Sequence, residues 1–406
     1  MIKKILLLIL IIINVFTLSS CWSKKEPKDL AIGTCFIYDI DDNERIKLIA
    51  EIYDPNIGSA EDSVMKKSYL LELEGQTVPE ALRNTTKTVA HLLYGAHNRA
   101  RIFTEKAAKD KMVDLLDYYV RGQLTNELPY LLVLKDEEDP LKVFEAQIGL
   151  YKLLGSYIDA IAEARMKTSI DAVFTTTLDF VRCHYCEGKQ PVMSVIQIVE
   201  NPASLPYEEE ENTPSGPPTQ YNLVFEGLAV FKDGKFLGYL DKNGAKAYNY
   251  LNNNVVSPYS SFALGEDDLM AIAINKSSTK IETSSQIAEG KVKIEVNIKD
   301  EFSVVHNQTQ YNTTKTKDVK LIEQAYNQSL QKDILEAITL VQQEYASDIF
   351  GFGRAFHRQN PKVWQQIKAE WDDVYFANAE VVVNVEGRLY VGGQTRERFG
   401  ERVINE

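Results

Sequence analysis

Two cysteines three positions apart, Cys183 and Cys186, have the residue type and spacing of redox and metal sites. In thioredoxin-like sites the reactive cysteine begins a helix, where the helix dipole stabilises the thiolate. Here the pair falls in the last turn of a predicted helix that stops at Gly188, and a thiolate is disfavoured at that end. That helix is indicated by apolar residues at helical spacing: Phe174, Leu178, Val181 and Tyr185. We interpret both as ordinary, partly buried cysteines; a disulfide and redox or metal chemistry are the alternatives.

A structural zinc site needs four ligands, and the sequence offers no second Cys/His pair at zinc spacing. The other histidines are scattered: His91, His97, His306 and His357. His97 and His357 have no partner close in sequence, so we expect each to be structural or exposed. We therefore predict no metal and no cofactor. The redox states of Cys35, Cys183 and Cys186 are left open.

The segment Phe350-Gly351-Phe352-Gly353 resembles a phosphate-binding loop in its glycines only. Such a loop follows a strand, and a P-loop carries Gly-Lys-Ser/Thr. This segment follows a long predicted helix and has no lysine, so we predict a helix C-terminus, with one glycine at positive φ and both phenylalanines in the core. Trp364 and Trp371 are expected in the core as well. Without a Gly-x-Ser-x-Gly motif or a Ser/His/Asp set, no catalytic residue is predicted and the protein is not expected to be an enzyme.

The N-terminus carries a secretory signal. Lys3 and Lys4 precede an apolar run, and Leu18-Ser19-Ser20-Cys21 has the form of a bacterial lipobox. We predict that residues 1–20 are removed and that Cys21 receives acyl chains such as palmitate, which hold the mature chain to a membrane outside the cytoplasm. The alternative is a transmembrane anchor, but the run of about 15 apolar residues is short for a span of about 20.

Composition bounds the remaining possibilities. The formal net charge is −13, and removing the two signal lysines makes the mature chain more acidic. Nucleic-acid binding needs a basic patch, so no nucleic-acid partner is expected. The hydrophobic content of 44% is ample for packed cores. Residues 201–220 hold five prolines and four consecutive glutamates and are predicted to be a linker or a long exposed loop.

The elements that must position these residues form an α+β pattern. Before the linker we predict strands at residues 32–40, 69–73, 131–134 and 192–199, and helices from Pro79 through Leu93, at 111–121 and at 148–164. After it we predict a hairpin around Asp233-Gly234, a short helix at 243–251, and strands at 270–274, 280–282, 291–298 and 381–385. A long helix at 319–345 precedes Asn360, an expected N-cap with Pro361 at the first helical position.

Taken in order, the mature chain resembles the C-subunit lipoproteins of spore germination receptors, the GerAC-type or Ger(x)C family. The matching segments are residues 348–356 with Pro361, Trp364, 367–368 and Trp371; residues 225–232 with 238–240; and residues 21–22, 29–31, 96–98, 104–108 and 115–121. Pro27, residues 33–35, the long linker and the tail after Gly393 depart from the family pattern. These departures leave open which receptor the chain serves.

The resemblance implies three small domains, each a largely antiparallel or mixed sheet flanked by helices: residues 21–200, 221–267 and 268–393, with a polar tail at 394–406. It also implies a non-enzymatic subunit of a nutrient germinant receptor on the outer face of the spore inner membrane, assembled with integral membrane A- and B-type subunits. Whether the chain contacts the germinant is left open. The rival interpretations are an extracytoplasmic solute-binding lipoprotein and, less favoured, a secreted hydrolase.

Overall fold

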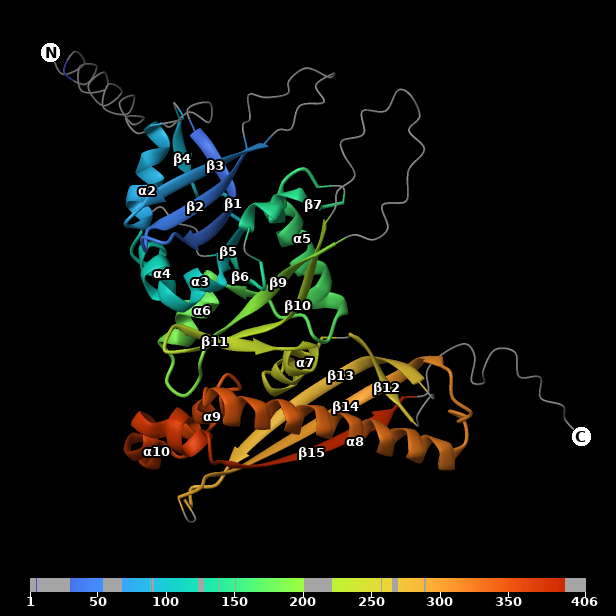
Figure 1. Cartoon of the computed structure of the whole chain (residues 1–406). Helices are drawn as coiled ribbons and strands as arrows, with labels where there is room; N and C mark the ends of the chain where they lie inside the picture. Colours follow the sequence, from blue (N-terminus) through green and yellow to red (C-terminus); the bar gives the residue numbers. More distant parts are fainter. Residues whose placement is uncertain are drawn as a thin grey trace, which may run out of the picture.

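The computed structural model describes residue 5 and residues 30–53, 68–122, 128–200 and 221–390, except positions 88, 90, 138, 150, 257, 265–268, 288 and 289. These residues form one sheet of eleven strands and one of four, each accompanied by helices (Figure 1). The fold is of the α+β class, as the sequence predicts. We call residues 30–240 the N-terminal body and residues 259–390 the C-terminal body; helix α7 (Lys242–Leu251) lies between the two sheets (Figure 1).

The large sheet has the order β11-β10-β9-β6-β5-β1-β2-β3, with β4, β7 and β8 as short additions to β1, β10 and β6. Its central pairs, from β1 through β5 and β6 to β9, are parallel, and its outer pairs are antiparallel. The strands are β1 (Leu30–Ile40), β2 (Ile46–Tyr53), β3 (Ser68–Gly75), β4 (Leu92–Tyr94), β5 (Ala100–Thr104), β6 (Tyr130–Leu134), β7 (Ala146–Gln147), β8 (Thr175–Thr176), β9 (Val192–Glu200), β10 (Tyr221–Lys232) and β11 (Lys235–Leu240).

Both faces of the large sheet are buried at its centre. On β1, Phe36 and Tyr38 enter one apolar cluster, whereas Cys35 and Ile37 enter the cluster on the opposite face. This alternation is the period of two expected for a strand. Helices α2 (Val78–Asn84), α3 (Glu105–Asp110), α4 (Met112–Arg121) and α6 (Thr177–His184) contribute to the first cluster, and α5 (Leu154–Thr168) contributes to the second. Short 3₁₀ turns occupy Thr85–Lys87 and Pro140–Glu145.

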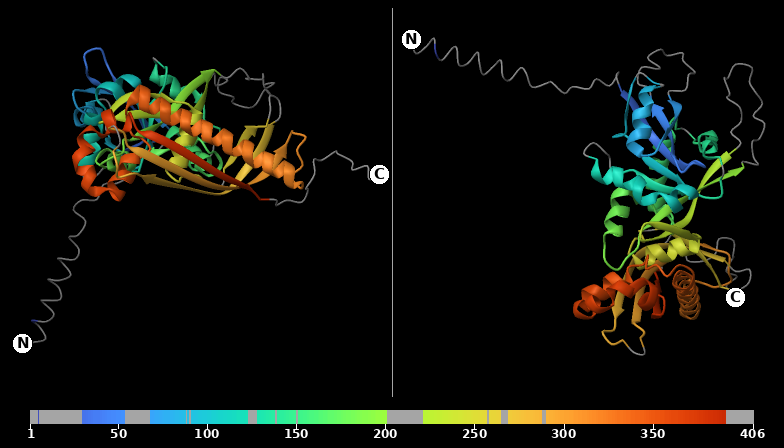
Figure 2. Two further views of the ribbon diagram at one scale, coloured as in Figure 1. Left: turned by 90° about the horizontal axis from the view of Figure 1, so that it is seen from below. Right: turned by 60° about the vertical axis from the view of Figure 1, so that its left-hand side comes forward.

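The C-terminal body is a four-stranded sheet crossed by one long helix. Strands β12 (Tyr259–Ala263), β13 (Leu269–Thr283), β14 (Lys293–Asn307) and β15 (Glu380–Leu389) lie in that order, and β15 is parallel to β14. Helix α8 (Thr316–Leu340), extended by a π turn at Val341–Tyr345, runs along the sheet (Figure 2). Beyond it, α9 (Phe352–Gln359) and α10 (Pro361–Ile367) are followed by a 3₁₀ turn at Lys368–Glu370 and a π turn at Trp371–Phe376.

One apolar cluster crosses from body to body. It contains Leu228 and Val230 of β10 together with Tyr250 of α7, Ile294 of β14 and Ile334 of α8. The alternate residues of β10, Ala229 and Phe231, face the cluster of the N-terminal body instead. One face of the hairpin β10–β11 therefore packs in the core of the N-terminal body, and its other face packs against α7 and the C-terminal body.

The structure confirms the predictions that rest on local signals. Asp233 and Gly234 both have positive φ (51° and 79°), as a tight hairpin turn requires. The short helix at 243–251, the helix at 111–121 and the long helix are present within a few residues of their predicted limits. Trp364 and Trp371 are buried, at 1% and 2% exposure.

Two predicted helices and two predicted strands were wrong in extent. The helix expected to run through Leu93 ends at Asn84, and Leu92 and Leu93 belong to β4, which pairs with the beginning of β1. The helix expected from residue 148 begins at Leu154. The two strands expected at 270–274 and 280–282 are the single strand β13, and β2 was not predicted at all. These strands are fixed by pairing with distant partners, which a local pattern does not show.

The segment 221–267, predicted as a small central domain, contributes its hairpin to the large sheet because β10 pairs with β9. The division into three domains stays a prediction. Of the predicted signal at 1–20, the structure describes residue 5 alone; Cys21, the predicted linker at 201–220 and the predicted tail at 394–406 lie outside the described residues.

Candidate functional site: the junction between the two bodies

The segment between the π turn and α9 folds around one buried carboxylate. Oδ1 of Asp348 accepts hydrogen bonds from the backbone N–H groups of Gly351 (2.8 Å) and Phe352 (3.1 Å). Its Oδ2 accepts from the N–H of Gly353 (2.6 Å) and from the indole Nε1–H of Trp371 (2.9 Å). Helix N-termini bind anions through such N–H groups. At α9 a side chain of the protein itself supplies the anion.

The backbone around this carboxylate differs in one respect from the prediction. The predicted helix end lies earlier, at Ala346, which takes the left-handed conformation (φ 42°). Phe350-Gly351-Phe352-Gly353 begins a helix rather than ending one, with Gly351 at the N-cap position and φ at 80°. The expectations of a glycine at positive φ and of two buried phenylalanines are confirmed.

The electrostatics of this carboxylate are unusual for an aspartate. Burial raises the pKa of Asp348 to about 6; the hydrogen bond from Gly353 opposes the rise, and the nearby Asp372 carboxylate adds to it. The pKa of Asp372 is also raised, chiefly by burial. Its Oδ1 accepts the backbone N–H of Asp348 at 2.7 Å, so the two carboxyl groups belong to one hydrogen-bonded unit.

This unit is bonded to the loop that follows α6 in the N-terminal body. The N–H of Gln190 donates to the carbonyl oxygen of Asp348 (2.8 Å), and the N–H of Arg354 donates to that of Gly188 (2.9 Å). The side-chain Nε2 of Gln190 donates to Oδ2 of Asp372 (2.8 Å). We call the contacts of residues 187–190 with residues 347–372 the junction.

Two glycines allow the backbones to approach closely at the junction. A Cβ placed on Gly188, whose φ is 75°, would lie 2.4 Å from the carbonyl carbon of Gly353. A Cβ on Gly353 would lie 2.6 Å from Nε1 of Trp371. A further contact joins Ser347, whose hydroxyl donates to the carbonyl oxygen of Phe231 in β10 (2.7 Å). The junction thus has no room for larger residues at the two glycines.

Glu187 forms the outer part of the junction. Its carboxylate accepts from Nε1 of Trp364 and from Nζ of Lys368, each at 2.9 Å, and Nδ1 of His357 lies 3.6 Å away. The Lys368 ammonium and the other donors lower the pKa of this exposed carboxyl. His357, which has no partner close in sequence and was expected to be structural or exposed, also stacks on the Trp364 ring, with centroids 5.4 Å apart. His97, the other such histidine, packs edge-on against Tyr94.

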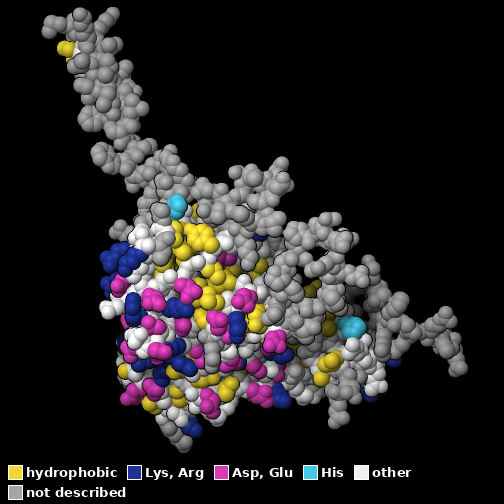
Figure 3. Space-filling view, turned by 45° about the horizontal axis from the view of Figure 1, so that its top comes forward, with side chains coloured by type: hydrophobic (Ala, Val, Ile, Leu, Met, Phe, Trp, Pro, Cys, Tyr) yellow, Lys and Arg dark blue, Asp and Glu magenta, His cyan; other side chains and the backbone are white. Residues whose placement is uncertain are grey.

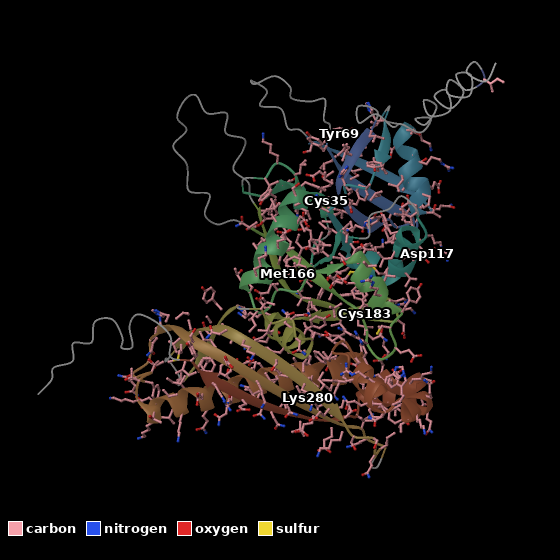
Figure 4. All side chains as sticks on the ribbon, turned by 180° about the vertical axis from the view of Figure 1, so that it is seen from behind. Cys35, Tyr69, Asp117, Met166, Cys183 and Lys280 are labelled. Atoms are coloured by element: carbon pink, nitrogen blue, oxygen red, sulfur yellow. The ribbon has the colours of Figure 1, made fainter. Side chains whose placement is uncertain are left out.

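The cysteine pair lies beside the junction, as Cys183 shows in Figure 4, at the level where the two bodies meet. Cys183 is in the last turn of α6, as predicted, whereas Cys186, which was predicted in the same turn, follows the helix. Among the described cysteines, Cys35, Cys183 and Cys186 are free thiols. Burial raises the pKa of Cys183 to about 11 and that of Cys35 well above its usual value, so both are protonated near neutral pH.

Within the described ranges, no group of three or more His, Cys, Asp or Glu side chains could hold a metal ion. None of the helices in the described part of the chain is both long and apolar enough to cross a membrane. Asp348 is completely buried and already accepts four hydrogen bonds. The junction is therefore arranged to hold two bodies in a fixed relation and does not present this carboxylate to a substrate.

Comparison with known proteins also divides the chain into two parts, with a boundary that lies earlier in the chain than the boundary between the two bodies. Residues 23–198 match the family described as "Spore germination protein N-terminal domain", and residues 226–390 match "Spore germination B3/GerAC like, C-terminal". In fold, the chain is similar to the crystal structure of the GerBC protein, with a TM-score of 0.51 at 14% identity, covering 87% of this chain and 96% of that one.

Curated relatives from Bacillus subtilis (strain 168) align over almost the whole chain. Spore germination protein KC is 23% identical, covering 96% of each chain. Spore germination protein A3 is 22% identical, covering 90% of this chain and 91% of its own. The fold and the junction define an α+β protein of two joined bodies. The chain belongs to the GerAC-like family of spore germination proteins.

Residues 348–356 were singled out in the sequence through the family resemblance. That their backbone surrounds the Asp348 carboxylate was not predicted. Asp348 was part of the matching segment, but its contact with Trp371 needs the chain to turn through α9 and α10. Glu187 and Gln190 were missed altogether, and no local signal points to them. Cys21, the predicted lipidation site, lies outside the described residues.

Proposed function

We propose that this protein is the lipid-anchored, non-enzymatic subunit of a nutrient germinant receptor. The observation that carries the proposal is membership of the GerAC-like family over both halves of the chain, at residues 23–198 and 226–390. Relatives that align over 88% to 96% of the chain are spore germination proteins. The lipobox at Cys21 supports attachment by acyl chains at the extracytoplasmic face.

The proposed role is assembly. The partners are integral membrane A- and B-type subunits, and the site of action is the outer face of the spore inner membrane. On the face of the molecule drawn in Figure 3, apolar side chains lie exposed between Lys/Arg and Asp/Glu side chains. A protein–protein interface places apolar side chains at its core and polar side chains at its rim, so a docking surface would use both kinds of group. The junction would keep the two bodies of the subunit in one orientation for its partners.

The test is the variant Cys21→Ala, compared with Cys186→Ala as a control that also removes one thiol. Cys21→Ala should leave the membrane fraction of spores and abolish or strongly reduce germination in response to nutrients. Cys186→Ala should behave as the unmodified chain. Normal membrane retention and germination of the Cys21 variant would contradict the proposal.

Purification of the tagged chain from detergent-solubilised spore membranes, followed by mass spectrometry, tests the partners. Two integral membrane germination subunits should be recovered with the unmodified chain. Recovery of a permease with an ATPase would indicate a solute-binding lipoprotein and overturn the receptor assignment.

A further inference from the structure

A hollow of about 500 Å³ lies beside the junction, between α6, the loop after it, α7 and α9. Cys183, in its wall, is labelled in Figure 4. Pockets for small ligands range from about 300 to 1,000 Å³. Part of the lining is apolar, from Val173, Pro191 and Val192. The hollow therefore has the size and the mixed lining of a site for a small organic molecule.

Three cations line this hollow: Arg182 of α6, Lys189 of the following loop and Arg354 of α9. The acid in the lining is Asp179, whose Oδ2 accepts the hydroxyl of Thr176 at 2.6 Å at the beginning of α6. The hollow is thus locally positive, although the whole chain has a formal net charge of −13. Such a concave positive surface concentrates anions from solution.

The three cations are not used in ion pairs. Nearby lysines are paired: Lys232 with Asp373, and Lys246 with Asp333. Arg182, Lys189 and Arg354, in contrast, form no ion pair with any carboxylate of the described residues. Their guanidinium and ammonium groups are available to a ligand.

Lys189 is the most enclosed of the three. Its Nζ donates to Oδ1 of Asn252 (2.5 Å) and to the hydroxyl of Tyr248 (3.4 Å), both neutral groups. Burial lowers the pKa of Lys189, but Tyr248, Cys183 and Asp348 together raise it above its usual value, so the ammonium keeps its charge. The Asp348 carboxylate, which acts on Lys189 through its charge, already accepts four hydrogen bonds within the junction.

We infer that this hollow binds a small organic anion through a carboxylate or phosphate group held by Arg182, Lys189 and Arg354. Guanidinium groups match the paired oxygens of both anions, and an ammonium adds a point charge. Tyr248, whose hydroxyl accepts from Lys189, lies in the same lining, and the apolar wall at Val173 and Val192 receives the organic part of the anion. This inference goes beyond the proposed function and does not depend on assembly with membrane subunits.

The experiment uses the full chain in detergent micelles, titrated separately with sodium phosphate and sodium succinate at constant ionic strength set by sodium chloride. Binding is measured by calorimetry and by the rise in melting temperature. The double variant Arg182→Gln/Arg354→Gln removes two cations of the hollow. The matched control, Arg83→Gln/Arg358→Gln, removes two exposed helical arginines that do not line it.

The unmodified chain and the control should bind at least one of the two anions, and the hollow variant should bind it at least tenfold more weakly. Binding of phosphate alone assigns a phosphorylated ligand, and binding of succinate alone assigns a carboxylate. Failure of both anions to bind the unmodified chain, or equal binding by the hollow variant and the control, overturns the inference. Either result leaves the test with Cys21→Ala unaffected.

Discussion

At the scale of single residues, buried carboxylates fix helix N-termini in both bodies. Asp348 accepts three backbone N–H groups at the beginning of α9. Glu51 of β2 does the same for α5, accepting the N–H groups of Leu154 (2.7 Å) and Gly155 (3.2 Å). Each carboxylate satisfies donors that the helix leaves unpaired and favours the positive end of the helix dipole. The role of Glu51 could not be predicted locally, because 103 residues separate it from Leu154. Asp348 lies only three to five residues before the N–H groups that it accepts, and only its hydrogen bond from Trp371 depends on the fold of α9 and α10.

The first prediction concerns the loss of this charge at the junction. Asp348→Asn replaces one accepting oxygen with an NH₂ group that faces N–H donors, leaving buried donors unpaired. We expect the free energy of unfolding at pH 8 to fall by about 3 kcal/mol. Asp373→Asn, which breaks the surface ion pair with Lys232 a short distance away, should cost less than about 1 kcal/mol. Chemical denaturation of both variants measures the difference, and equal losses would contradict the assigned role of Asp348.

The pH dependence of stability tests the same carboxyl. Its pKa is about 6 in the folded protein, against 3.8 as its ordinary value. Between these values the folded state retains a proton that the unfolded state has lost, so the contribution of Asp348 to stability decreases as pH rises from about 4 to 6. Asp348→Asn has no such proton.

The stability advantage of the unmodified chain over Asp348→Asn should therefore shrink by roughly 2.5 kcal/mol between pH 4 and pH 7. Asp372 titrates in both proteins, so its contribution largely cancels in this comparison. Denaturation at a series of pH values provides the measurement. An advantage that is constant or grows over this range is incompatible with a raised pKa of Asp348.

At the scale of elements, what could be predicted depended on how local the determining contacts are. The hairpin β10–β11 was predicted because Asp-Gly is a residue pair that readily adopts the positive φ values of its turn. The long helix was predicted from its apolar period. Strand β4 was missed because Leu92 and Leu93 also fit the apolar spacing of the preceding helix. Their pairing with Leu30 and Ala31 of β1 makes them a strand.

Asn360 shows the same limit within one element. It occupies the predicted N-cap position of α10, with Pro361 following. Its side chain forms no capping bond, and Nδ2 instead donates to the hydroxyl of Thr283 in β13 at 2.9 Å. The position could be read from the sequence, whereas the partner is set by the packing of α9 and α10 against the sheet.

The close approach of two loops at the junction gives a prediction at this scale. Gly188→Ala places a methyl group against the backbone of Gly353 and strains a positive φ. Gly290 has nearly the same φ (78°) and open space around it, so Gly290→Ala carries the backbone strain alone. We expect Gly290→Ala to lower the free energy of unfolding by about 1 kcal/mol and Gly188→Ala by a further 1–3 kcal/mol, roughly. Equal losses in the two variants would mean that the close contact between Gly188 and Gly353 adds nothing to the cost of the substitution.

At the scale of the whole molecule, the two bodies share a core. The apolar cluster that includes Leu228 and Leu240 of the hairpin also includes Phe302 and Phe352 of the C-terminal body. The polar contacts of the junction lie beside it. The two family matches divide the chain near residues 198–226, yet the hairpin after that division pairs with β9 before it. Domain boundaries read from sequence similarity therefore differ from the units of packing.

This shared core predicts that the bodies unfold together. Trp364 and Trp371 report on the C-terminal body by fluorescence, and the buried thiol of Cys35 reports on the large sheet when it becomes reactive. Denaturant transitions followed by the fluorescence and by mass spectrometry of the labelled Cys35 peptide should have the same midpoint. Gly188→Ala should separate the two midpoints because it weakens the junction, whereas Gly290→Ala should leave them coincident. Separate midpoints in the unmodified chain would show that the bodies are independent, and the junction would then be a contact without a mechanical role.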